Sequence, residues 1–69
     1  MMDTERRLAL SDELNEVANR VASLARRVHD AGDPGGSMEL GQMVAMLRNI
    51  ADGLEYDEDG NLIRPEVPS

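Results

Sequence analysis

Apolar residues recur along the first half of this chain at alternating intervals of four and three residues. This spacing keeps their side chains on one side of an α-helix, at positions equivalent to a and d of a heptad. The chain is therefore expected to be all-α, beginning with one long amphipathic helix. The residues of this first stripe are Leu10, Leu14, Val17, Val21, Leu24 and Val28.

A second stripe with the same spacing follows, formed by Leu40, Met43, Leu47, Ile50 and Leu54. Between the stripes, Gly32 favours the positive φ that closes many helices, and the residues 33–36 (Asp-Pro-Gly-Gly) interrupt helical structure. The pattern predicts helices over residues 11–31 and 37–53, about 30 Å and 24 Å long. Helices of similar length joined by a short turn are expected to pair as an antiparallel helical hairpin.

Polar residues suggest where these helices begin. Ser11 and Ser37 are expected to cap the first and second helix, and Gly53 is expected to end the second. Leu8 falls about 160° around the helical wheel from Leu10. Residues 1–10 are therefore either a separate short helix, which we favour, or a continuation of the first helix.

Residues 54–69 are predicted to form an acidic C-terminal tail. Together with Asp52, this segment contains six acidic residues and one basic residue, Arg64. Residues 55–63 have short apolar flanks around Gly60, a pattern typical of a small β-hairpin.

A chain of 69 residues rarely gains more than about 3–5 kcal/mol from one core. It has no cysteine and a single histidine, so disulfides and a structural zinc site are excluded. Self-association is the expected source of stability, giving a homodimeric four-helix bundle. The strip Ala18, Ala22 and Ala25 lies beside the first stripe and should let another helix approach closely. The predicted oligomer or core seam is Leu14, Val17, Val21, Leu24, Val28, Leu40, Met43, Leu47 and Ile50.

Composition excludes several classes of function. A net charge of −7 and the presence of only one aromatic residue argue against direct nucleic-acid binding. No long apolar run or secretion signal is visible, so a cytoplasmic protein without membrane contact is expected. Cysteine is absent as a nucleophile and the serines have structural explanations, so neither enzymatic activity nor a metal or cofactor is expected.

These exclusions predict a non-enzymatic protein-interaction module that acts as a small regulator or inhibitor. All basic residues are Arg, a bias that favours a bacterial or phage genome. A partner protein is expected to bind a helical face and the acidic tail, because Met and Tyr are adaptable contact residues and the tail carries charge. The candidate residues for this contact are Leu8, Met46, Tyr56, Asp57, Glu58 and Asp59.

Two alternatives remain open. In the first, an oligomer sequesters a signalling nucleotide, and Arg20, Arg27 and Arg48 would supply the donors that phosphate requires. In the second, the chain is a structural subunit of a larger assembly. The hairpin outline is similar to small bundle-forming regulators and to phage hairpin proteins that sequester cyclic nucleotide signals, but no motif selects one group.

Overall fold

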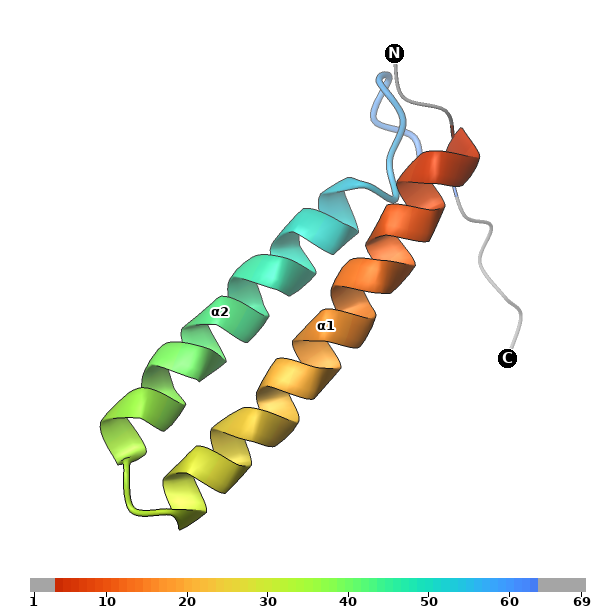
Figure 1. The fold of residues 1–69 in the computed structure, drawn as a ribbon. Coiled ribbons are helices and arrows are strands. Elements are labelled where there is room, and N and C mark those ends of the chain that lie inside the picture. Colours follow the sequence, from red (N-terminus) through yellow and green to blue (C-terminus); the bar gives the residue numbers. More distant parts are fainter. Residues whose placement is uncertain (1–3, 64–69) are drawn as a thin grey trace, which may run out of the picture.

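The computed structural model describes residues 4–63, which form two antiparallel α-helices lying side by side (Figure 1). Helix α1 spans Thr4–Asp30 and helix α2 spans Pro34–Gly53. This confirms the predicted all-helical hairpin. Residues 1–3 of the predicted N-terminal segment and residues 64–69 of the predicted acidic tail lie outside the described residues. Neither helix is long and apolar enough to cross a membrane.

Helix α1 is continuous from Thr4, so the favoured break before Ser11 is wrong. Ser11 is not an N-cap but is completely buried within the helix. Its hydroxyl donates a hydrogen bond of 2.9 Å to the carbonyl oxygen of Ala51 in α2. This carbonyl also accepts a hydrogen bond of 3.2 Å from the backbone N–H of Leu54, so Ser11 gives it a second donor from the neighbouring helix. The hydroxyl of Ser11 is therefore used between the helices and not at a helix start.

Helix α2 begins three residues earlier than predicted, because Asp33 and not Ser37 is its N-cap. The Oδ1 atom of Asp33 accepts a hydrogen bond of 3.0 Å from the backbone N–H of Gly36. Pro34 occupies the first helical position, where its fixed φ suits a helix and its missing N–H costs nothing. The predicted interruption is thus the first turn of α2, while Gly32, with φ of +99°, closes α1 as predicted.

The helices contact each other through small side chains. Ser11, Ala18 and Ala25 of α1, spaced seven residues apart, are buried along with Val44 and Ala51 of α2. Small side chains allow the axes of two helices to approach closely. Among residues 4–63, no Leu, Ile or Met is buried. The hairpin therefore has a narrow interior, with its large apolar residues outside this line of contact.

The first turns of α1 also hold the chain that leaves α2. Arg7 donates from Nη2 to the carbonyl oxygens of Gly53, at 3.3 Å, and Tyr56, at 2.8 Å. Beyond Tyr56 the chain turns back through Gly60, which has φ of +86°. In this segment the predicted β-hairpin is reduced to one antiparallel bridge, between Tyr56 and Leu62.

Candidate functional site

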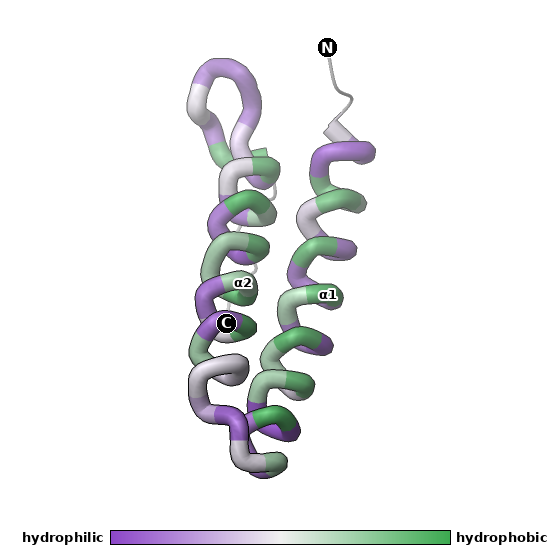
Figure 2. The backbone as a smooth tube through the Cα atoms, turned by 60° about the vertical axis from the view of Figure 1, so that its left-hand side comes forward, coloured by the Kyte–Doolittle hydropathy of each residue, from purple (hydrophilic) through white to green (hydrophobic). Residues whose placement is uncertain are grey.

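Large apolar side chains form one exposed surface of the hairpin, the apolar face. Hydrophobic segments recur turn by turn along both helices, whereas the loop after α2 is largely hydrophilic (Figure 2). Side chains in the middle of this face remain highly exposed: 45% for Val17, 45% for Leu24, 49% for Met43 and 55% for Ile50. The apolar face comprises Leu10, Leu14, Val17, Val21, Leu24 and Val28 of α1, and Leu40, Met43, Met46, Leu47, Ile50 and Leu54 of α2.

Helix geometry explains why both stripes lie on the same face. Val17 and Leu24 each directly precede a buried alanine of α1, and Met43 and Ile50 each directly precede a buried residue of α2. One position along an α-helix corresponds to a rotation of about 100°. Because the two helices are antiparallel, the same rotation turns both rows to one side of the hairpin.

This arrangement corrects one expectation. We expected the Leu and Val stripes to pack against each other and the alanine strip to face another helix. Instead Ala18 and Ala25 lie between α1 and α2, while Ala22 is half-buried beside them. Alanine is favoured at these positions of α1 because it permits a closer approach of the two helices than Leu or Val would at the same positions. The role of the stripes as an oligomer seam stays a prediction.

The apolar face contains a shallow hollow on α2. It is lined by Met43, Met46, Leu47 and Ile50 and has a volume of about 150 Å³. Met46 is 63% exposed at the outer edge of this hollow. Such a concave apolar surface accommodates an apolar side chain of another helix, as in helix-in-groove recognition.

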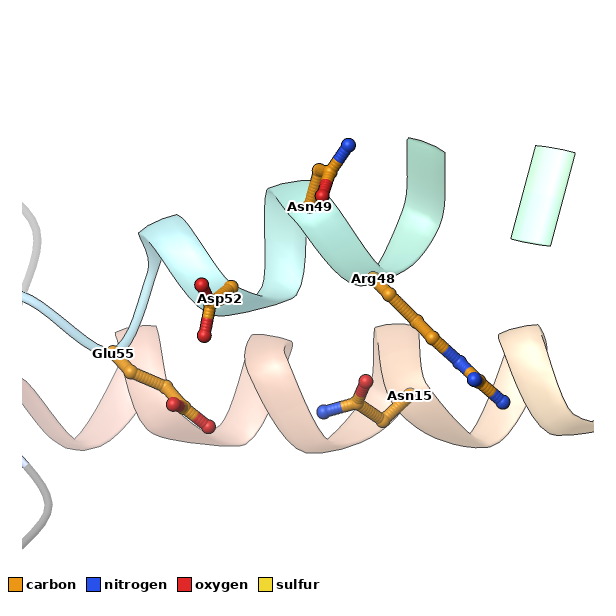
Figure 3. A pocket seen from close by; sticks show the side chains of 5 residues that line it. All are labelled: Asn15, Arg48, Asn49, Asp52 and Glu55. Carbon is orange, nitrogen blue, oxygen red and sulfur yellow. The ribbon is translucent and has the colours of Figure 1, made fainter. Parts of the chain in front are cut away.

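The opposite side of the hairpin is polar. Asn15 of α1 faces Arg48 and Asp52 of α2, and Glu55 follows at the end of α2; Asn49 points away from α1 (Figure 3). These five residues line an open hollow of about 320 Å³. Arg48 crosses to α1, where its Nη2 donates a hydrogen bond of 3.2 Å to Oδ1 of Asn19. This side therefore joins the two helices by polar contacts.

The structure does not bring all the predicted partner-binding residues together. Leu8 is half-buried on α1 but lies outside the apolar face, whereas Met46 belongs to that face. Tyr56 is 40% exposed and lies in the loop after α2. Asp57 has a structural role, because its Oδ1 accepts hydrogen bonds from the backbone N–H groups of Asp59 and Asn61, both at 2.9 Å. Glu58 and Asp59 project from the same loop and are exposed.

The three arginines proposed for a nucleotide site do not converge within one chain. Arg20 and Arg27 each follow a buried alanine by two positions, which places them about 200° from the line of contact and on the side of α1 away from α2. Arg48 instead contacts Asn19 between the helices.

Sequence reasoning missed Ser11 and Arg7 as residues that join the two ends of the chain. A signal for Ser11 was present: it lies seven residues before Ala18 and fourteen before Ala25, in the same series of small residues. Arg7 carries no such signal, because its acceptors are backbone carbonyls 46 and 49 residues away.

Comparison with protein-family models, with curated proteins and with solved structures reveals no match for this chain.

Proposed function

We propose that this chain is a non-enzymatic protein-interaction module, a small regulator or inhibitor that works as a homodimeric four-helix bundle. The observation that carries the proposal is that small side chains are buried and large apolar side chains are exposed, the reverse of the usual arrangement in a protein core. Residues buried between the helices are Ser, Ala and Val, whereas no Leu, Ile or Met among residues 4–63 is buried and most of them lie on the open apolar face. A hairpin with so small an interior gains most by covering that face.

The free energy available from covering the face is of the order that association requires. Full burial of a large apolar side chain contributes roughly 1.5–3 kcal/mol. Five residues of the face are about half exposed, so each has about 1 kcal/mol still to gain, or roughly 10 kcal/mol for two chains. This is comparable with the cost of association, roughly 4–15 kcal/mol, and the half-buried leucines add to it. The five are Val17, Leu24, Met43, Met46 and Ile50.

Two adjacent substitutions test the use of this face. Ile50→Glu places a charge in the middle of the apolar face, whereas Asn49→Glu places the same charge on the neighbouring residue, which points away from α1. We expect Ile50→Glu to be monomeric or unfolded and Asn49→Glu to remain dimeric with wild-type helix content. Light scattering and circular dichroism measure both properties. An Ile50→Glu chain that is as dimeric and as helical as Asn49→Glu would refute the proposal.

A partner protein is expected to bind the loop after α2, which stays accessible when the apolar face is covered. This loop exposes Tyr56 beside Glu58 and Asp59. Its carboxylates favour a partner with a basic surface, because opposite charges steer association. The double variant Glu58→Gln/Asp59→Asn removes two charges and keeps Asp57, whose carboxylate holds the loop.

Affinity capture from the native host compares three forms of the protein. The full chain should retain a partner, and the charge variant should retain less of it, with the difference shrinking at high salt. A chain ending at Gly53 should keep both helices and the dimer but lose the partner. Equal retention by all three forms would assign partner binding to the helices instead of the loop.

Sequestration of a nucleotide is the less favoured function. It requires arginines that converge on phosphate, and Arg20 and Arg27 lie on a different side of the hairpin from Arg48. Within residues 4–63, the charges gathered by the polar hollow are one arginine and two carboxylates. This combination does not select an anion.

A further inference from the structure

We infer that two copies of the hairpin pack through their apolar faces with their turns at opposite ends, so that the two-fold axis runs perpendicular to the helices through the level of Val17 and Leu47. This inference rests on the proposed function, since it specifies how the second copy covers the face. A two-fold axis in the interface has two possible directions. An axis parallel to the helices would place both turns at the same end of the dimer. An axis perpendicular to the helices places the two turns at opposite ends.

The face has the dimensions that a second hairpin needs. Its longer stripe runs from residue 10 to residue 28, about 27 Å at 1.5 Å per residue, and two helices side by side are about 20 Å wide. The smallest dimension of the chain is 16 Å, as expected for one layer of helices. The second copy therefore meets a flat surface of equal size and chemistry, which is the requirement for an isologous interface.

Contacts within the hairpin locate the middle of this face. Ser11 bonds to Ala51, and a Cβ atom on Gly36 would lie 3.3 Å from Cγ1 of Val28. Residues at the same level in α1 and α2 thus have numbers that sum to about 63. Val17 is therefore level with Leu47, and both belong to the central part of the apolar face. An axis through this level aligns residues 10–24 of α1 and 40–54 of α2 with the same residues of the second copy.

The unequal charge of the two ends of the hairpin favours one direction of the two-fold axis. The end of the hairpin away from the turn, residues 4–12 and 52–63, carries seven carboxylates and two arginines. The turn end, residues 26–39, carries two arginines and three carboxylates. Turns at the same end would hold the two strongly acidic ends close together. Turns at opposite ends separate the two acidic ends by more than the Debye length of about 8 Å and place each beside the partner's turn end, which carries a smaller excess of carboxylates.

The two arrangements predict different neighbours for Val17. With turns at opposite ends, α1 packs against α1 of the second copy, and Val17 lies next to the second Val17. With turns at the same end, α1 packs against α2 of the second copy, and Val17 lies next to Leu47. A disulfide requires two Cα atoms about 4.4–6.8 Å apart, so it reports which neighbour is present.

Single cysteines test the inference cleanly because the chain has none of its own. We expect Val17→Cys to form a disulfide-linked dimer on mild oxidation, and the control Asn49→Cys, outside the face, to form none. If Val17→Cys cross-links only when mixed with Leu47→Cys, the turns lie at the same end, and the inference is wrong while the interaction module stands. If neither cross-links and sedimentation finds a monomer, both the inference and the proposed dimer are wrong.

A distance measurement gives the same answer without disturbing the face. Ala31 lies in the exposed turn, about 14 residues from the level of the axis. A spin label on Ala31→Cys should lie about 40 Å from the second label if the turns are at opposite ends. A distance of about 20 Å or less would place the turns together and overturn the inference.

Discussion

Replacing Ala18 by Leu places three additional carbon atoms in the line of contact between α1 and α2. The Ala18 side chain has 0% exposure there, so no space receives the larger side chain. Overpacking of this kind costs about 1–3 kcal/mol. Helices lined by larger side chains pack nearer to 10 Å than to 8 Å apart, which also stretches the Ser11 to Ala51 hydrogen bond, at a further cost of about 1 kcal/mol.

The expected loss of stability is therefore about 2–4 kcal/mol. For a chain of this length, 1 kcal/mol corresponds to a shift of about 7 °C in Tm, so Ala18→Leu should lower Tm by about 15–30 °C. Ala9→Leu is the matched control, because it makes the same substitution in α1 at an exposed position outside the apolar face. The control should change stability by less than about 0.5 kcal/mol. Thermal unfolding followed by circular dichroism at one protein concentration measures both, and equal melting of the two variants would refute the small-residue packing.

Two further pairs of variants test local contacts. Ser11→Ala should lower the free energy of unfolding by only about 1 kcal/mol, because the carbonyl of Ala51 still accepts from the N–H of Leu54. Ser23→Ala, at an exposed position, should leave stability unchanged. Equal stabilities of the two variants in urea unfolding would contradict the role of the Ser11 hydroxyl. Gly41→Ala should stabilise α2 by about 0.5–1 kcal/mol, since a Cβ there meets nothing within 4 Å. Gly36→Ala should destabilise α2, since a Cβ there would lie 2.6 Å from the capping carboxylate of Asp33. If Gly36→Ala raised Tm as much as Gly41→Ala, the cap would be unimportant.

The helical hairpin could be predicted because its signals are local. Apolar spacing of three and four residues determines which residues are helical, and Gly32 has the positive φ that its position predicts. The start of α2 could also have been read from the sequence. Asp33 followed by Pro34 is a stronger helix start than Ser37, because Asp caps well and Pro suits the first helical position.

The packing of the helices could not be predicted from periodicity alone. An apolar stripe indicates which side of a helix avoids water but not which neighbour covers it. Here Ala18 and Ala25 face the other helix of the same chain, and Val17 and Leu24 remain exposed. The role of Arg7 was also inaccessible, since its acceptors are carbonyls of a distant segment.

Sedimentation equilibrium of the unmodified chain at micromolar concentration tests the central claim most directly. If the apolar face serves to bind another copy, the measured mass is twice the chain mass of 7.6 kDa, about 15 kDa. The same sample should show high helix content by circular dichroism. A stable, fully helical species with the mass of a single chain would contradict the claim that this face is covered by association.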